Sequence, residues 1–376
     1  MATKTCSLVE ELKTLTDPRR QCANLKHRLE DIVLIALCAT LAGCDDCVEV
    51  AAWARRHEAF LRTFLELPNG IPSHDTFTRV LALLQPSAVQ GLVLPWLAER
   101  RGLPGGLVHL DGKTMRRTRC KAAGLGALHV VSAWAGENGL TLGQVAVEAK
   151  SNEITALPQL LELLDLKEKI VTIDAAGCQK DIAAQIVAQG GDYVLAVKEN
   201  QPTLYAEIET AFATALETDS PQCRCITHRD EGHGRQERRI VWTLPAAGWL
   251  SLCDVWSGLV SVVMVLRVVT CPVTGVETSE LRYFISSLRP SVRRLARAIR
   301  GHWSIENGLH WVLDVVFRED ARRVYDRTAA QNIAFLNRLA VSLLRGDPRP
   351  GSLKVKRKEA GWDVAYLAQL LGLPSR

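Results

Sequence analysis

Two short apolar segments in this 376-residue chain each end in an aspartate. Asp111 closes the segment Leu-Val-His-Leu-Asp, and Asp174 closes the segment Ile-Val-Thr-Ile-Asp. Apolar runs of this length predict buried strands. Further along, Glu306 lies in a segment whose apolar residues recur at steps of two to four, as in a helix with one buried face. Two strands ending in Asp and one helix carrying Glu can bring three carboxylates to one point.

The region between residues 107 and 216 is predicted to contain three strands, then a helix, a strand, a helix, a strand and a helix. The expected segments are 107–110, 128–135, 140–147, 154–164, 169–173, 179–189, 192–197 and 202–216. This is the element order of an RNase H-like α/β fold. In that fold the first and fourth strands lie side by side, so Asp111 and Asp174 are expected to be neighbours.

The rest of the chain is predicted to form four further parts. Residues 1–95 are expected to be a helical N-terminal domain, with one amphipathic helix over Val48–Leu65 and a third helix capped by Ser73. Its short helices fit either a DNA-binding helix-turn-helix or a bundle for packing or dimer contact. The catalytic domain is expected over 96–216 and 288–346, with a β-rich insertion at 217–287. The Glu306 helix is expected to be interrupted or bent near Gly301, and residues 347–376 to form a basic C-terminal tail with a final short helix.

The distribution of charged and apolar residues indicates what kind of partner the protein binds and in which compartment it is found. Basic residues gather at 116–121, 289–300, 318–327 and 349–358, although the formal net charge is only +5. Basic clusters around an acidic site favour a polyanionic partner such as DNA. The longest apolar run, 32–43, is shorter than the about 20 residues that cross a bilayer. Eleven cysteines and no apolar leader favour a reducing, cytoplasmic location without a membrane anchor.

Three carboxylates without a required cysteine favour Mg²⁺ or Mn²⁺, which prefer oxygen ligands. Phosphodiester chemistry by metal-activated water uses two such ions roughly 4 Å apart. Asp111, Asp174 and Glu306 are therefore predicted to be both catalytic and metal-binding. Glu319 and Asp320 compete with Glu306 for the place of the third acid, since they follow it closely in the sequence.

Basic and histidine side chains near these acids are candidates for contacts with DNA phosphates. Arg293, Arg297 and Arg300 are spaced to lie on one helical face, and Lys113 follows Asp111 by two residues. The full set of DNA-binding candidates is Lys113, Arg116, Arg117, His233, Arg235, Arg293, Arg297, Arg300 and His302.

Several segments together resemble the DDE transposases of bacterial insertion sequences, in the branch of the H-repeat-associated proteins. The matching segments are Leu-Pro-Asn-Gly-Ile-Pro-Ser-His-Asp-Thr-Phe (67–77), Asp-Gly-Lys-Thr (111–114), Thr-Ile-Asp-Ala-Ala-Gly-Cys-Gln-Lys (172–180), Asp-Tyr-Val-Leu-Ala-Val-Lys-Glu-Asn-Gln (192–201), His-Gly-Arg (233–235), and His-Trp-Ser-Ile-Glu-Asn with Leu-His-Trp-Val-Leu-Asp-Val (302–315). They extend over nearly the whole chain. The wider superfamily carries a Tyr-Arg-Glu-Lys signature around its glutamate. Here Ile299, His302 and Leu313 stand at the positions of its Tyr, Arg and Lys.

The resemblance implies an RNase H-like catalytic domain with an Asp-Asp-Glu triad at Asp111, Asp174 and Glu306. It also implies a transposase that binds terminal inverted repeats, cleaves the element ends and transfers strands to target DNA, acting as a homodimer because two ends are processed together. Two other functions stay open from the sequence. One is an RNase H-like nuclease that cuts without joining, and the other is a DNA-binding transposase relic without catalysis.

Overall fold

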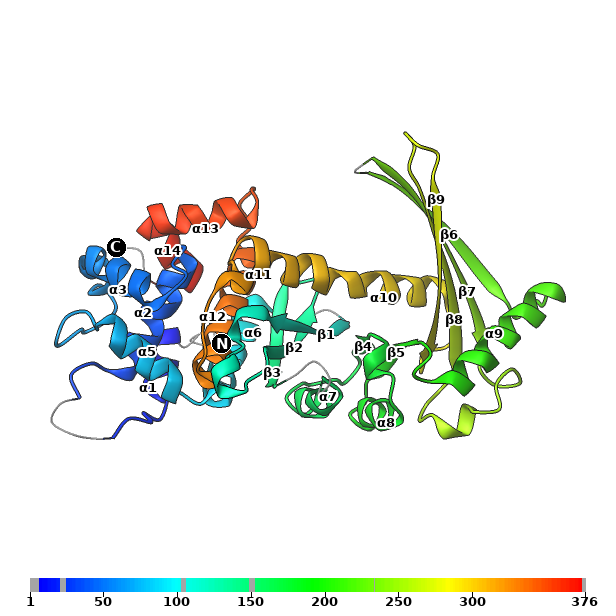
Figure 1. Cartoon of the computed structure of the whole chain (residues 1–376), viewed down its shortest axis with the longest axis horizontal. Coiled ribbons are helices and arrows are strands. Elements are labelled where there is room, and N and C mark those ends of the chain that lie inside the picture. Colours follow the sequence, from blue (N-terminus) through cyan, green and yellow to red (C-terminus); the bar gives the residue numbers. More distant parts are fainter. Residues whose placement is uncertain (1–6, 21–24, 103–105, 149–152, 233, 374–376) are drawn as a thin grey trace, which may run out of the picture. The chain divides into compact units, whose positions relative to one another are not determined.

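The computed structural model describes residues 7–20, 25–102, 106–148, 153–232 and 234–373. Helices and a large mixed β-sheet make it an α/β protein (Figure 1). The chain divides into two compact units. Unit 1 consists of Met1–Gly105, Gly112–Asn152 and Ile305–Arg376, and unit 2 consists of Gly106–Asp111 and Glu153–Ser304. The five-part division expected from the sequence stays a prediction.

Unit 1 is mainly helical. Its elements are α1 (Leu8–Lys13), α2 (Leu29–Leu41), α3 (Cys47–Arg56), α4 (Glu58–Leu61), α5 (His74–Leu83), α6 (Pro86–Arg101), the hairpin of β2 (Leu128–Ala135) and β3 (Leu140–Val147), α11 (Trp311–Val315), α12 (Arg327–Gly346), α13 (Leu353–Trp362) and α14 (Val364–Leu371). The Ser73 side chain accepts a hydrogen bond from the Thr76 N–H, which confirms the predicted cap of α5.

The core of unit 1 combines the first and last helices of the chain. Helix α2 is apolar almost all round and nearly every residue in it is buried, as expected for a central helix. Helix α12 buries most of its length, and its residues join one apolar cluster with α1 to α6 and α14. The N-terminal helices therefore complete their core with residues from the C-terminal part of the chain.

Unit 2 contains the first part of β1 (Leu107–Met115), followed across the sheet by β4 (Ile170–Ile173), β5 (Asp192–Val197), β9 (Glu277–Ser286), β8 (Ser261–Thr270), β7 (Arg235–Pro245) and β6 (Arg224–Gly232). Strand β4 is parallel to β1 and β5, whereas β9 is antiparallel to β5. The strands predicted between residues 217 and 287 are thus confirmed, and they extend the same sheet. The helices of unit 2 are α7 (Glu153–Glu162), α8 (Lys180–Ala188), α9 (Pro202–Glu217) and α10 (Val292–Ile305).

Helix α10 packs on the sheet of unit 2 through a buried face that includes Leu295 and Ile299. The interruption predicted near Gly301 is wrong, because α10 continues through this residue to Ile305. A Cβ atom at Gly301 would lie 3.1 Å from His109 Cε1, so glycine permits close approach of the helix to β1. The helix is instead interrupted by a π-turn at Glu306–His310.

Three other local predictions need correction. Strand β1 does not end at Asp111 but runs to Met115, because ion pairs allow Lys113 to be buried within it. The helix expected over Val48–Leu65 is broken at His57, whose ring Nδ1 bonds to the Trp53 carbonyl oxygen. The basic C-terminal region contains α13, which sequence reasoning missed.

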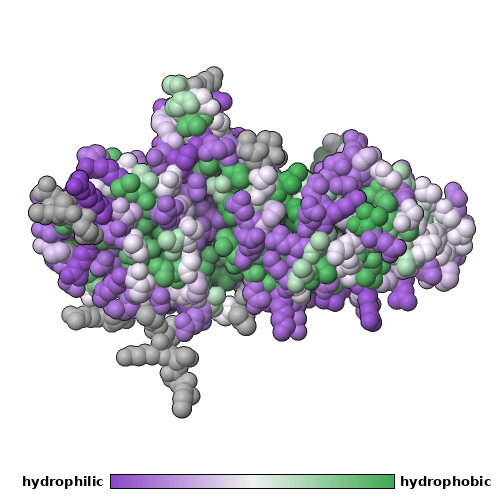
Figure 2. All heavy atoms as spheres, turned by 90° about the horizontal axis from the view of Figure 1, so that it is seen from below, coloured by the Kyte–Doolittle hydropathy of each residue, from purple (hydrophilic) through white to green (hydrophobic). Residues whose placement is uncertain are grey.

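The face seen in Figure 2 is a mosaic of hydrophilic and hydrophobic residues. Among the described helices, none by itself has the length and apolar content needed to cross a membrane. The pair α5 and α6, bent by 93°, meets both criteria only when the two helices are taken together.

Candidate active site

Asp111 lies in β1, and Asp174 directly follows the paired strand β4 in unit 2. Leu110 of β1 is in register with Ile173 of β4. Asp111 directly follows Leu110, and Asp174 directly follows Ile173. The predicted pairing of the first and fourth strands is therefore confirmed. Asp174 also begins the 3₁₀ turn Ala175–Gly177, where its Oδ1 accepts a hydrogen bond from the Ala176 N–H at 3.0 Å. Both aspartates are half-buried.

Neighbouring carboxylates repel one another at this position. The pKa of Asp174 is raised, first by burial and then by the negative charges of Glu153 and Asp111. Glu153, in the first turn of α7, is only 4% exposed. Sequence reasoning missed Glu153, because an acid in the first turn of a helix is common on electrostatic grounds alone. Unit 2 thus brings two further carboxylates, Glu153 and Asp111, close enough to Asp174 to raise its pKa.

The oxygen donors of Asp111, Asp174 and Glu153 suit a hard divalent cation. A cation would relieve the repulsion that raises the Asp174 pKa. As the side chains stand, however, no three His, Cys, Asp or Glu residues within the described part of the chain are close enough together to hold an ion. The donor chemistry therefore fits Mg²⁺ or Mn²⁺, whereas the ligand geometry is not preassembled.

Glu306 is exposed and begins the π-turn of unit 1. A π-turn inserts an extra residue into a helix and is often found at functional sites. The Gly308 carbonyl oxygen of this turn accepts hydrogen bonds from the Arg345 side chain of α12. Trp134 lies against the same turn, 3.4 Å from where a Gly308 Cβ would be. Side chains from α12 and β2 therefore support the turn that presents Glu306.

Glu319 is unsuited to replace Glu306. Its carboxylate is buried and lies 3.1 Å from the Arg338 guanidinium, with both side chains 0% exposed. The Asn337 side chain donates a further hydrogen bond to Glu319 at 3.2 Å. A carboxylate held in this way stabilises unit 1 and is not open to solvent or ligand.

Asp320 and Asp314 are engaged by basic side chains of β1 and the turn after it. Lys113 Nζ lies 2.6 Å from Asp314 Oδ1 and 3.2 Å from Asp320 Oδ1, and Arg116 Nε lies 3.2 Å from Asp320 Oδ2. Lys113 is buried between these acids and so is less accessible to a phosphate than its sequence position suggested.

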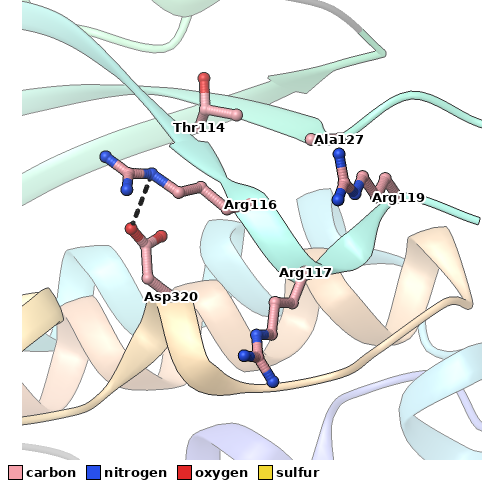
Figure 3. Close-up of a pocket in the computed structure, with 6 residues that line it drawn as sticks. All are labelled: Thr114, Arg116, Arg117, Arg119, Ala127 and Asp320. Carbon is pink, nitrogen blue, oxygen red and sulfur yellow. Dashed lines mark ion pairs between the residues drawn. The ribbon is translucent and has the colours of Figure 1, made fainter.

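Arg116 and Arg117 are exposed and line an open cavity of unit 1 (Figure 3). The same cavity is lined by Arg119, which was not among the predicted DNA-binding residues. All three arginines come from the short segment that follows β1.

The arginines of α10 are exposed on the face opposite its buried residues. Arg293 lines an open cavity of about 890 Å³ together with Arg224 and Arg289. Arg300 is partly neutralised, because its guanidinium lies 2.8 Å from Asp230 of β6. Arg297 is exposed on the same face.

Of the two histidines predicted to contact DNA, His302 and His233, the structure describes His302. His302 Nδ1 is 2.9 Å from Thr172 Oγ1, which also bonds to His109 Nδ1 at 2.7 Å. Burial, reinforced by His302, lowers the His109 pKa to about 3, so His109 is neutral. His302 is half-buried in unit 2, and its contact with DNA stays a prediction. His233 lies outside the described residues, and Arg235 is exposed at the start of β7.

Comparison with known families decides the class of protein. The family described as "Transposase DDE domain" matches residues 104–343, and the family described as "DDE_Tnp_1-associated" matches residues 9–97. The chain belongs to the DDE transposase family. The resemblance inferred from the sequence is thereby confirmed.

Relatives of this DDE transposase align over most of its length. It is 38% identical to "Putative transposase YncI" of Escherichia coli O157:H7, over 97% of this chain and 94% of the relative. It is 35% identical to "H repeat-associated putative transposase YhhI" of Escherichia coli (strain K12), over 97% of both chains. A Xanthobacter autotrophicus relative, "Uncharacterized protein in dhlA 3'region", is 43% identical over 73% of this chain and 92% of its own length.

Proposed function

We propose that this chain is an insertion-sequence transposase that binds the element ends and catalyses DNA cleavage and strand transfer through Asp111, Asp174 and Glu306. The observation that carries the proposal is the parallel register of β1 and β4, which makes Asp111 and Asp174 neighbours. The raised pKa of Asp174 supports a site that gains stability when a cation binds. Glu306 lies in the other unit, and its approach to the two aspartates is part of the proposal.

We infer that the catalytic domain is RNase H-like and that the N-terminal helices form a DNA-binding or dimer-contact domain. The order of elements from β1 to α9 supports the first inference, because it follows the succession expected of that fold. The match of residues 9–97 to a separate associated family supports the second.

The proposed cofactor is a pair of Mg²⁺ or Mn²⁺ ions held by Asp111, Asp174 and Glu306. Such ions supply Lewis acidity to the attacking and leaving oxygens of a phosphodiester. Asp111 is central in this scheme because it lies in the middle of β1. The chain's own contribution is to fix the carboxylates on rigid elements, β1, the start of the turn after β4, and the π-turn.

The proposed reaction has two phosphoryl-transfer steps. In cleavage, water attacks the phosphorus at the element end, the bond to the 3′ oxygen breaks, and that oxygen takes up a proton. In strand transfer, the resulting 3′-hydroxyl attacks a phosphorus of target DNA, loses its proton, and displaces the target's own 3′ oxygen. No oxidant, reductant or external energy source is required, because one phosphodiester replaces another in the second step.

The proposed partners are the terminal inverted repeats, target DNA and a second copy of the chain, since both ends must be processed together. Exposed arginines at Arg116, Arg117, Arg293 and Arg297 are the groups best placed to bind backbone phosphates. The proposed location is the bacterial cytoplasm, in association with the nucleoid.

A strand-transfer assay on DNA carrying the element's own ends tests this function. Wild type and Asp111→Ala are incubated with Mg²⁺, end DNA and target plasmid, and nicked and joined products are separated on gels. Asp254→Ala is the matched control, because Asp254 is an exposed acid in a 3₁₀ turn of the same unit. We expect joined products with wild type and with the control, and none with Asp111→Ala.

The same assay separates the rival functions. Cleavage without joining by wild type would identify a nuclease rather than a transposase. Binding without cleavage would identify a relic that has lost catalysis. Joining by Asp111→Ala at the wild-type rate would contradict the proposed triad.

A further inference from the structure

The segment after β1 builds a cationic cavity in unit 1. Thr114, Arg116, Arg117, Arg119, Ala127 and Asp320 line an open space of about 510 Å³. Figure 3 shows that the three arginine side chains extend from one short segment and that the Arg116 guanidinium points toward the Asp320 carboxylate. The lining thus combines three guanidinium groups with a single carboxylate.

Internal hydrogen bonds fix the backbone that carries these arginines. The buried Thr118 hydroxyl donates to the Met115 carbonyl oxygen at 2.7 Å and accepts from the Leu128 N–H at 2.7 Å. Arg327 donates from one guanidinium nitrogen to the Thr118 carbonyl oxygen at 3.3 Å. A turn that is held at both ends presents its side chains with little loss of backbone freedom on binding.

Among the described residues of the lining, Asp320 is the only acid, and it already bonds two cations. Its Oδ2 lies 3.2 Å from Arg116 Nε and its Oδ1 lies 3.2 Å from Lys113 Nζ. Lys113 has a second partner in Asp314, whereas the Arg116 side chain is 80% exposed. An ion pair this open to solvent is weak, so another anion can exchange with it.

A phosphodiester is the anion that best matches this cavity. Guanidinium groups bind phosphate oxygens through two parallel N–H donors, a geometry that lysine lacks. The described lining carries three positive arginines and one negative carboxylate, so it has an excess of two positive charges (3 − 1). The Asp320 carboxylate, paired with Arg116, occupies a position that a phosphate oxygen could take on that guanidinium.

We propose that this cavity binds a backbone phosphate of DNA, and that Asp320 is a built-in competitor that holds Arg116 in the free protein and releases it on binding. Arg119 is then a DNA contact together with Arg116 and Arg117. This inference rests on the proposed function only in taking DNA as the ligand. It requires neither metal nor catalysis.

The test measures binding of a short fluorescent duplex by anisotropy, in EDTA, to wild type and to Asp320→Asn. We expect Asp320→Asn to lower Kd by about three- to tenfold, because phosphate no longer competes with the carboxylate. We also expect the slope of log Kd against log salt concentration to be steeper for this variant, by up to about one. In wild type, the Asp320 carboxylate that is freed on DNA binding takes up a salt cation, which lowers the net number of ions released, and Asp320→Asn removes this uptake.

Glu99→Gln is the control for net charge. Glu99 is an exposed acid of the same unit, lies beyond the N-terminal region 1–95, and is not part of the cavity lining. It should change Kd only slightly and leave the salt dependence unchanged. Equal effects of Asp320→Asn and Glu99→Gln on both quantities would overturn the proposal.

Two further variants keep the proposal falsifiable if Asp320→Asn is poorly folded. Arg119→Ala, at an exposed position, should raise Kd several-fold and keep the wild-type melting temperature. Combining Asp320→Asn with Arg116→Ala should abolish most of the gain, since Asp320 acts mainly through Arg116. Unchanged binding by Arg119→Ala together with an undiminished gain in the double variant would overturn the assignment.

Inorganic phosphate distinguishes a nucleic-acid contact from a site for free phosphate. If Asp320→Asn gains a phosphate-induced rise in melting temperature but no affinity for duplex, the cavity binds a free anion and the proposal fails. Absence of catalysis in the strand-transfer assay leaves this binding result unaffected. Conversely, failure here leaves the proposed triad intact.

Discussion

Arg345 donates two hydrogen bonds to the carbonyl oxygen of Gly308, from Nε at 3.1 Å and from a terminal guanidinium nitrogen at 2.8 Å. The acceptor lies inside the π-turn that begins at Glu306, and the donor lies in the last turn of α12. Irregular helical turns leave backbone carbonyls that need partners from elsewhere. Arg345 therefore supports the turn from which Glu306 extends, and we expect it to act by positioning Glu306 rather than by touching metal or DNA.

Arg345→Ala should slow DNA cleavage while leaving duplex affinity nearly unchanged. Loss of the two hydrogen bonds frees the turn to move, and a displacement of about 1 Å at a catalytic group costs roughly 10²-fold in rate. Single-turnover cleavage and anisotropy binding measured on the same preparation check this. Arg345→Lys, which keeps one charged donor, should restore part of the rate. A fall in affinity equal to the fall in rate would instead indicate a DNA contact.

Asp174→Asn should stabilise the metal-free protein at neutral pH. The raised pKa means that folding favours the protonated carboxyl, so this stabilising contribution is present at low pH and is lost as pH rises through the folded pKa. Thermal melting in EDTA across a pH series should show wild type losing stability relative to Asp174→Asn over that interval. Parallel curves for the two proteins would contradict the expectation.

Mg²⁺ should reverse this difference between wild type and Asp174→Asn. An ion that binds only the folded state raises the free energy of unfolding, by an amount that grows with the logarithm of the ion concentration relative to Kd. Wild type should therefore show a higher melting temperature with Mg²⁺ than in EDTA, and Asp174→Asn a much smaller rise. The Asp254→Ala variant, at an exposed turn of the same unit, should respond as wild type does. An equal response of all three proteins would argue against metal binding at Asp174.

Glu319→Gln should lower the stability of the protein, whereas Glu306→Gln should lower its activity and leave its stability unchanged. Removing one partner of the buried Glu319–Arg338 pair leaves an uncompensated charge, which lowers the free energy of unfolding by about 3–5 kcal/mol. Glu306 is exposed, so its amide variant should melt as wild type does and yet fail to cleave DNA. Denaturant unfolding and the cleavage assay together check this. An active Glu306→Gln would remove Glu306 from the triad.

Arg357→Ala should unfold unit 1 more readily and should not act primarily on DNA binding. The buried guanidinium donates hydrogen bonds to the carbonyl oxygens of Thr40 and Val316, and it lies 3.1 Å from Asp45. Lys354→Ala and Lys358→Ala, on the exposed side of α13, serve as controls with the same loss of charge. Melting temperature should fall only for Arg357→Ala. Equal melting of the three variants would show that the buried contacts contribute little.

Local sequence patterns were sufficient to predict those elements whose structure is determined by residues close together in the sequence. The bounds of β2 and β3 were predicted correctly, because the Gly136–Gly139 turn separates two apolar strands. The pairing of β1 with β4 followed from the order of elements alone. The pairing of β1 with β4 places Asp111 beside Asp174, which is the part of the site that the sequence predicted well.

Features that depend on distant partners could not be predicted in this way. The π-turn was missed because the apolar spacing around Glu306 is that of an ordinary helix, whereas the residue that supports it, Arg345, lies on another helix. Arg357 counted as part of a basic cluster, although backbone carbonyls from two other segments surround it. Glu319 was a candidate ligand until Arg338 was found beside it.

The division of unit 1 into three chain segments affects how such a gene can decay. Residues beyond Glu306 include α12, whose buried side chains complete the core around α1 to α6. A premature stop between Asp320 and Arg327 would leave every proposed catalytic acid encoded and still remove this helix. Truncated copies of this kind would keep a complete triad in their sequence but lack a folded protein to carry it, so an intact motif alone does not identify a mobile element that can still move.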